Sequence, residues 1–198
     1  MSDSSPWSDR RRAFRDLHRS GCFALPNPWD IGSVKRLEKL GFKALASSSA
    51  AAAWALGKTD GAISLEEALE HLRMLCAASG LPINADFENA FADDPEGVAA
   101  NVSRAATTGV AGLSIEDSTG DKANPIYEKG LAVERIRAAR KAIDTDRSSV
   151  LLVGRCEAFL WGKSDLGFVI ERVQVYSVAG ADCLYAPGLK SKDDIATV

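Results

Sequence analysis

Short apolar runs alternate along the chain with longer segments that have the apolar spacing of amphipathic helices. The runs begin about 30 residues apart, which is the length of one βα unit. Alternating β and α elements predict a parallel sheet with helices packed outside it. The predicted strands are Cys22–Pro26, Phe42–Ala46, Leu81–Ala85, Ala111–Ile115, Val150–Val153 and Asp182–Tyr185.

Start and stop signals mark the helices between these runs. Ser64 with a Glu three residues later is typical of a helix N-cap, and Asp94 followed by Pro95 is typical of another. Gly residues at positions 80, 109 and 180 indicate where helices end. The predicted helices are Ile31–Leu40, a segment from Ser64 to Gly80, a segment opening at Pro95, Ala132–Ile143, Leu166–Val178 and the start of a helix in Ser191–Val198.

Length and composition are typical of one globular domain. The 198 residues are 46% hydrophobic and 26% charged, so the chain can bury a core and global disorder is excluded. The net charge of −3 argues against a dedicated nucleic-acid binder, and no apolar stretch reaches the roughly 18 residues of a membrane helix. With no secretory h-region and no C-x-x-C pair, we expect a cytoplasmic protein. Residues 1–16 are interpreted as an N-terminal extension and residues 17–198 as a single domain.

Polar residues follow five of the predicted strands, at the carboxyl ends where α/β proteins place their chemistry. Because side chains of a strand alternate between faces, residues two apart share a face. If these faces point into a barrel, carboxylates and one guanidinium meet at a single mouth. The pairs are Asn84 with Asp86, Ser114 with Glu116, and Arg155 with Glu157.

These residue types point to a metal-assisted site for a small anion. Inward carboxylates such as Asp86 and Glu116 repel each other unless a cation joins them, and Mg²⁺ suits one or two carboxylates plus substrate. The planar fork of Arg155 suits a substrate carboxylate. The turn Ser47–Ser49 has backbone N–H groups to offer an anion.

Structural interpretations of the same residues stay open. Asp86 and Asp117 could each be the N-cap of the following helix. Arg155 and Glu157 could form an interior ion pair, and Ser47–Ser49 could be an ordinary loop. His18 and His71, with no second ligand at metal spacing, are interpreted as structural or surface residues.

Seven short segments also carry a family resemblance. They are Leu25–Asp30, Gly41–Ser47, Leu56–Asp60, Ile83–Asn89, Gly112–Asp117, Arg155–Phe159 and Ala179–Asp182. In order and spacing they resemble the isocitrate lyase/phosphoenolpyruvate mutase superfamily, and most closely its bacterial group without an assigned substrate. The resemblance runs from about residue 17 to residue 198 and implies a (β/α)₈ barrel of the TIM type. A complete barrel needs about 250 residues, so we expect one truncated after about six βα units.

The resemblance implies roles for individual residues. Asp86 would bind Mg²⁺, or Mn²⁺ in its place, with Glu116 supporting the metal through water. The Ser-rich turn would contact the 2-oxo acid end of the substrate through backbone amides. With the strand-end pattern, the predicted catalytic residues are Arg155, Glu116, Asp60 and Lys122; the predicted substrate-binding residues are Ser47, Ser48, Ser49, Asn84, Asn124 and Glu157; and the predicted metal ligands are Asp86 and Glu116.

Two departures from the family pattern bear on activity. Asn84 stands where many members have the first Asp of an Asp-x-Asp pair, which reduces the negative charge available to a metal. No Cys lies between Cys76 and Cys156, so the Lys-Lys-Cys-Gly-His loop of isocitrate lyases is missing from this stretch. Isocitrate lyase activity itself is therefore not expected.

The predicted function is that of a Mg²⁺-dependent lyase acting on a C–C bond of a small 2-oxo or 2-hydroxy (di)carboxylate through an enolate-like intermediate. The spacing of Lys122 and Asn124 leaves open a phosphonate P–C bond enzyme of the phosphoenolpyruvate mutase or phosphonopyruvate hydrolase type. A third possibility is an incomplete barrel without catalysis of its own. A small-molecule substrate is expected as the partner, with no nucleic acid and no membrane, and a homo-oligomer if the chain is full-length.

Overall fold

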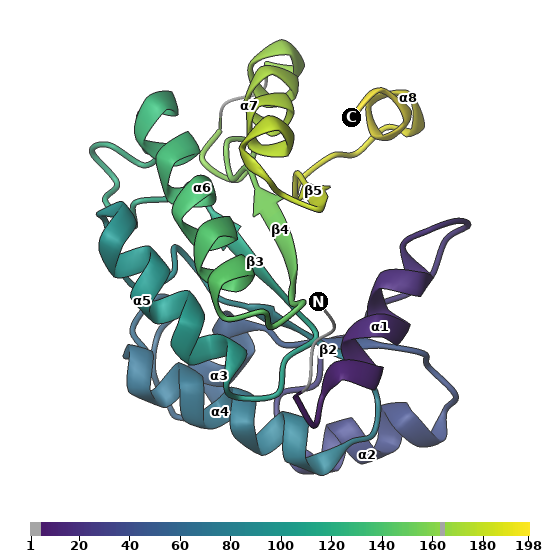
Figure 1. Cartoon of the computed structure of the whole chain (residues 1–198). Helices are drawn as coiled ribbons and strands as arrows, with labels where there is room; N and C mark the ends of the chain where they lie inside the picture. The colour runs from purple at the N-terminus through teal and green to yellow at the C-terminus, as the bar shows by residue number, and fades with distance from the viewer. Residues whose placement is uncertain (1–4, 163–164) are drawn as a thin grey trace.

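Five parallel strands form the centre of the computed structural model, which describes residues 5–162 and 165–198. Their order in the sheet, β1-β2-β3-β4-β5, is their order in the chain, and the sheet curls into part of a barrel (Figure 1). The predicted α/β class and partial TIM-type barrel are confirmed. The strands are β1 Leu45–Ala46, β2 Ile83–Asp86, β3 Gly112–Glu116, β4 Leu151–Arg155 and β5 Cys183–Tyr185.

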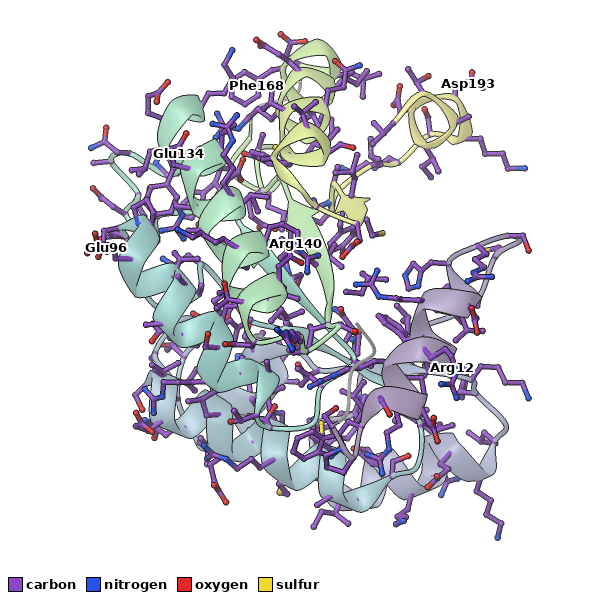
Figure 2. The ribbon with its side chains drawn as sticks, in the orientation of Figure 1. Arg12, Glu96, Glu134, Arg140, Phe168 and Asp193 are labelled. Carbon is purple, nitrogen blue, oxygen red and sulfur yellow. The ribbon has the colours of Figure 1, made fainter. Side chains whose placement is uncertain are left out.

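Helices connect the strands and cover the outside of the curled sheet (Figure 1). Charged side chains on their far faces, such as Glu96 and Glu134, point into solvent (Figure 2). No helix within the described residues is long and apolar enough to cross a membrane. The helices are α1 Ser8–Leu17, α2 Ile31–Lys39, α3 Ser49–Ala55, α4 Leu65–Ala78, α5 Pro95–Ala106, α6 Lys129–Thr145, α7 Leu166–Ala179 and α8 Lys192–Thr197.

Local signals fix several helix ends. The Ser64 side chain accepts a hydrogen bond from the N–H of Glu67, whose carboxylate accepts one from the N–H of Ser64 at 2.8 Å. Asp94 caps α5, and Gly180 ends α7 in the left-handed conformation at φ 112°. These three predicted boundaries are confirmed.

The alternation along each strand divides the core into two parts. On β4, Leu152 packs into the large core between the sheet and helices α4 to α7, whereas Leu151 and Val153 face the barrel interior. Phe14 of α1 is fully buried and packs into that interior beside Leu151 and Val153. Arg11 of α1 donates to the carbonyl oxygens of Ala106, Val110 and Ser148 and so ties α1 to the sheet. Residues 1–4 of the predicted N-terminal extension lie outside the described residues.

Two predicted segments differ from the structure. Cys22–Pro26 is not a strand: one hydrogen bond, from the N–H of Ala46 to the carbonyl of Pro26 at 3.0 Å, joins it to β1. Pro26 and Pro28 have no N–H to extend a ladder. Ser47–Ser49 is not a simple turn either, because α3 begins at Ser49 with Ser48 as its N-cap.

Candidate active site

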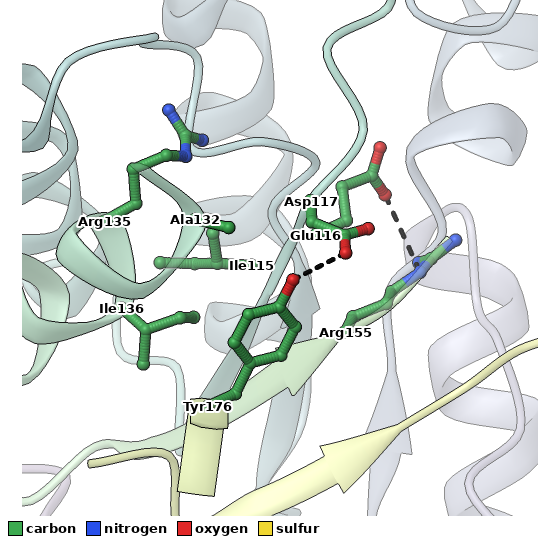
Figure 3. Close-up of a pocket in the computed structure, with 8 residues that line it drawn as sticks. All are labelled: Ile115, Glu116, Asp117, Ala132, Arg135, Ile136, Arg155 and Tyr176. Carbon is green, nitrogen blue, oxygen red and sulfur yellow. Dashed lines mark hydrogen bonds and ion pairs between the residues drawn. The ribbon is translucent and has the colours of Figure 1, made fainter. Parts of the chain in front are cut away.

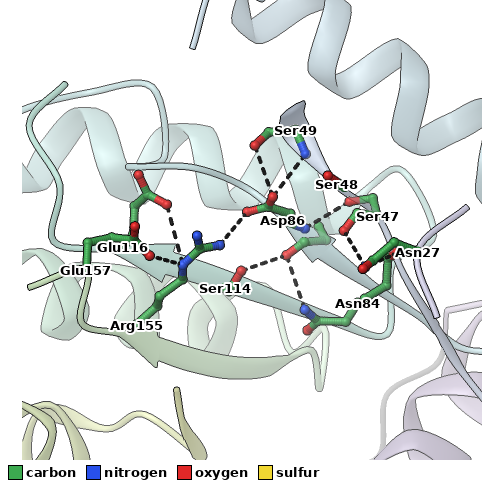
Figure 4. Close-up of polar contacts among 12 residues, drawn as sticks. Asn27, Ser47, Ser48, Ser49, Asn84, Asp86, Ser114, Glu116, Arg155 and Glu157 are labelled. Carbon is green, nitrogen blue, oxygen red and sulfur yellow. Dashed lines mark hydrogen bonds and ion pairs between the residues drawn. The ribbon is translucent and has the colours of Figure 1, made fainter. Parts of the chain in front are cut away.

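Arg155, the last residue of β4, lies at the centre of an acidic cluster (Figure 4). Its Nη1 lies 3.0 Å from Oδ1 of Asp86, at the end of β2. Its Nε lies 3.6 Å from Oε2 of Glu116, at the end of β3, and also donates to Glu157. The structure therefore brings together four residues that the strand-end pattern predicted for the site. The interior pair of Arg155 with Glu157 does form, as part of this larger cluster.

Asp86 is held from the opposite side by the segment that starts α3. The backbone N–H and the hydroxyl of Ser49 donate to Oδ2 of Asp86 at 2.9 and 3.0 Å. The N–H of Asp86 donates in turn to the Ser47 hydroxyl at 2.9 Å. Asp86 is thus fixed between α3 and Arg155 and does not cap α5, whose N-cap is Asp94. Of the three serines predicted to contact the substrate, Ser47 and Ser48 line the cavity described next, whereas Ser49 is engaged with Asp86.

A cavity of about 480 Å³ opens beside this cluster, inside the barrel. Asp86, Arg155 and Asn84 form part of its wall, and the Oδ1 atom of Asn84 is buried and has no hydrogen-bond partner in the described structure. Asn84 and Asp86, expected on one face, both line this wall, whereas Glu116 and Glu157 do not line the cavity with their expected partners Ser114 and Arg155. The other polar residues on the wall are His18, Asn27, Ser47, Ser48, Ser114 and Tyr185.

Burial and mutual repulsion raise the pKa values of three carboxyl groups at the site, so each of them resists ionisation. Burial, with repulsion from Glu157, Asp86 and Glu88, raises the pKa of Glu116 to about 8 despite the attraction of Arg155. Burial and the charges of Asp86 and Asp60 raise the pKa of Glu88 to about 7. Burial also raises the pKa of Glu157. The carboxylates therefore outnumber the positive charge that Arg155 supplies.

Glu88 is a site residue that the strand-end argument missed. It lies two residues beyond Asp86, and its Oε1 is buried without a hydrogen-bond partner in the described structure. Its backbone is in the left-handed region at φ 47°, and its carbonyl accepts from the N–H of Glu116 at 3.0 Å. The same spacing of two that paired Asn84 with Asp86 would have indicated Glu88, although it lies past the end of β2.

Asp117 is hydrogen-bonded to buried groups next to the site. It is not a helix N-cap, because Glu128 caps α6. Its carboxylate accepts from the N–H of Glu157 at 2.8 Å and from Nε of Arg172 at 2.8 Å. It also accepts from the hydroxyl of Tyr176 at 2.6 Å (Figure 3). A cavity of about 10 Å³, large enough for about one water molecule, is lined by Asp117 and Tyr176 of this network and by Glu116. The network joins α7 to the turn that follows β4.

Three predicted site residues lie outside the cluster. Asp60, exposed in the loop after α3, contributes through the electrostatic effect on Glu88 already described. Lys122 and Asn124 are exposed in the loop after β3 and do not line the cavity. That loop is organised locally, since the Thr119 hydroxyl donates to the Asn124 carbonyl at 2.6 Å.

The donor set fits a hard cation bound largely through water. Asp86, Glu88 and Glu116 offer carboxylate oxygens, the ligands that Mg²⁺ prefers, and Glu88 has an oxygen in need of a partner. No three His, Cys, Asp or Glu side chains in residues 5–162 and 165–198 are gathered closely enough to hold a metal by themselves. Mg²⁺ usually keeps several waters and takes one or two protein carboxylates, which agrees with this arrangement.

Comparison with known proteins gives a consistent picture. The family model for phosphoenolpyruvate phosphomutase matches residues 14–198. The oxaloacetate decarboxylase of Rhodopseudomonas palustris strain HaA2 is 32% identical over an alignment that covers 97% of this chain and 68% of that enzyme. A Burkholderia cenocepacia J2315 structure, provisionally described as a lyase/mutase, is 45% identical with a TM-score of 0.95, over 97% of this chain and 70% of its own. An oxaloacetate acetylhydrolase in complex with its product oxalate is 26% identical with a TM-score of 0.87, over 98% and 68%.

Proposed function

Because this chain belongs to the phosphoenolpyruvate mutase/isocitrate lyase superfamily, we propose that it is a Mg²⁺-dependent lyase acting on a C–C bond of a small 2-oxo or 2-hydroxy carboxylate. The observation that carries the proposal is the excess of carboxylates around Arg155, beside a cavity inside the barrel. Such a cluster is stable in its ionised form only when a further cation joins it.

Asp86 is the residue we assign to direct metal binding, because it is fixed from both sides and lines the cavity. Glu116 and Glu88 would hold metal-bound water, and Mn²⁺ would substitute for Mg²⁺ at such an oxygen-rich site. When bound, the cation supplies positive charge that stabilises the enolate oxygen of the intermediate.

Arg155 is the group we assign to the substrate carboxylate. Its Nε and Nη1 are engaged by the acidic cluster, whereas its Nη2 makes no hydrogen bond within the described residues. Ser48 and Asn84 lie on the same cavity wall and complete a polar cradle. The three carboxylates around Arg155 hold its pKa above the usual range, although burial alone would lower it. The guanidinium therefore stays charged throughout turnover.

Two of the relatives carry names that support C–C chemistry, whereas the matching family model carries the name of a phosphomutase. Oxaloacetate decarboxylase and oxaloacetate acetylhydrolase both act on a 2-oxo dicarboxylate. The Lys122 and Asn124 pair, on which the phosphonate alternative depended, lies outside the cavity. We therefore place oxaloacetate, its 3-alkyl derivatives and the corresponding alkyl-substituted 2-hydroxy dicarboxylates first among the substrates to be tested.

A substrate screen with product analysis tests this proposal. The purified chain is incubated with Mg²⁺ and oxaloacetate, 2-methylisocitrate or phosphonopyruvate, and products are followed by NMR. Asp86→Ala, at equal concentration, corrects for decarboxylation by free metal, and Glu96→Gln on the outer face of α5 is the matched control. We expect Mg²⁺-dependent cleavage of a C–C substrate that falls at least about tenfold in Asp86→Ala and is unchanged in Glu96→Gln. Turnover of phosphonopyruvate alone, or equal turnover by Asp86→Ala, would reject it.

A further inference from the structure

The loop between β2 and α5, residues 88–93, carries Glu88 into the site in an unusual backbone conformation. Glu88, Ala90 and Phe91 have positive φ values of 47°, 60° and 55°. Residues with a Cβ rarely occupy this left-handed region, because the Cβ crowds the following carbonyl oxygen. Three such residues in four positions persist only when the surroundings determine them.

Every carbonyl oxygen of this loop is held by a donor from outside it. The carbonyl of Glu88 accepts from the N–H of Glu116. Asn101 of α5 donates its amide to the carbonyls of Ala90 and Phe91 at 2.9 and 3.3 Å. Arg135 of α6 donates to the remaining three, those of Asn89, Ala92 and Asp93.

Arg135 is placed for this task by its burial. It is only 1% exposed, and its guanidinium lies 4.1 Å from the centre of the Tyr127 ring. The Tyr127 hydroxyl accepts a hydrogen bond from the Asn89 side-chain amide at 3.2 Å and donates one to Asp93, so Tyr127 also stabilises this loop. Burying a guanidinium costs free energy, and here the group donates its hydrogen bonds to loop carbonyls. We therefore infer that the conformation of this loop matters to the protein.

The geometry points to Arg135, with Asn101, as a positioning residue that forces the 88–93 loop into its left-handed course and so aims the Glu88 carboxylate at the acidic cluster. That this loop placement serves metal binding rests on the proposed function, whereas the holding of the loop by Arg135 does not. Neither side chain lines the site cavity, so each acts through the loop.

Mn²⁺ binding, followed by electron paramagnetic resonance of the free ion, gives one readout. We expect Arg135→Met to weaken Mn²⁺ binding about 10- to 100-fold, Asn101→Ala to weaken it less, and Arg137→Met on the exposed face of α6 to leave it unchanged. Adding Ala90→Gly to Arg135→Met should restore part of the affinity, because glycine adopts positive φ without strain. Equal Mn²⁺ affinity in wild type and Arg135→Met would overturn the positioning role.

Hydrogen exchange supplies the second readout, which does not need a metal. In Arg135→Met the amides of Ala90 and Phe91, bonded to Phe87 and to the Asn89 side chain, should exchange at least about tenfold faster, with the amides of β3 unchanged. Uniform acceleration across the protein, or no change in the loop, would overturn the inference. If wild type binds no Mn²⁺ but the loop still loosens selectively, the proposed function fails and the positioning role stands.

Discussion

The buried carboxylate of Asp117 offers the sharpest test of how this site is built. Asp117, Arg172 and Tyr176 are 3%, 3% and 1% exposed, and the Asp117 carboxylate accepts from both of the others. Asp117→Ala leaves the Arg172 guanidinium buried, with the Tyr127 carbonyl at 2.7 Å and the Tyr176 hydroxyl at 3.0 Å as its remaining partners. Breaking a buried ion pair on one side costs about 3–5 kcal/mol of unfolding free energy.

Further substitutions provide reference values with which this loss of unfolding free energy can be compared. Tyr176→Phe keeps the ring and the ion pair but removes the hydroxyl that donates to Asp117 and accepts from Arg172, and a hydrogen bond to a charged group contributes about 1.5–3 kcal/mol. Asp117→Ala combined with Arg172→Met removes both charges, so the double variant should lose less than the sum of the two single ones. Asp144→Ala is the control, because the Asp144 side chain is 66% exposed in its ion pair with Arg140 and the loss of such a solvent-exposed charge costs about 1 kcal/mol or less.

Urea unfolding followed by circular dichroism measures each of these free energies. We expect the order Asp117→Ala above Tyr176→Phe above Asp144→Ala, with a coupling energy between Asp117 and Arg172 of at least about 1 kcal/mol. A loss below about 1 kcal/mol for Asp117→Ala, or additive effects of the two charge removals, would refute the reasoning. Such a result would mean that solvent already reaches the Arg172 guanidinium in the folded protein.

Two more predictions concern buried groups away from the acidic cluster. Burial raises the pKa of Cys76 and Cys156 to about 12, so at pH 8 we expect iodoacetamide to modify the exposed Cys22 and to spare these two until urea is added. Because both thiols ionise near 9 when unfolded, their contribution to the free energy of unfolding should be constant below pH 8 and should fall as the pH rises from 9 toward 12; an unfolding free energy that stays constant from pH 9 to 12 would contradict the assignment. Gly112→Ala places a Cβ 2.6 Å from the Asn84 oxygen, so we expect a loss of about 1–3 kcal/mol in urea unfolding, and an unchanged midpoint would show that the wall of the cavity yields.

Local interactions explain why so much of the fold could be predicted. The capping pair of Ser64 with Glu67, the Asp94 cap and the Gly180 stop each depend on residues within a few positions of one another. The alternation of strand side chains likewise follows from the backbone alone, and it placed Asp86 and Arg155 on one wall of the cavity. Cys22–Pro26 is not a strand for an equally local reason, since Pro26 has no backbone N–H to donate to a neighbouring strand.

The rest of the site depends on contacts between distant parts of the chain. Asp86 and Arg155 are 69 positions apart, and Asp117 meets Tyr176 across 59 positions. No local pattern distinguishes an Asp that caps a helix from one that binds a buried arginine, so Asp117 was open to the wrong interpretation. The spacing of two along β2 pointed to Glu88, but Glu88 lies past the end of the strand, and the conformation of the loop that carries it is held by donors on α5 and α6.

The sequence by itself determined the order of elements, the strand faces and the family, because these follow from spacing and from short motifs. The tertiary structure alone decided which charges meet, how deeply they are buried and which of them lack a partner. Those quantities depend on distance and on exclusion of water, and both come into being only when the sheet curls and the helices close over it. The acidic cluster around Arg155, and the raised pKa values of Glu88 and Glu116 within it, are the products of that curvature.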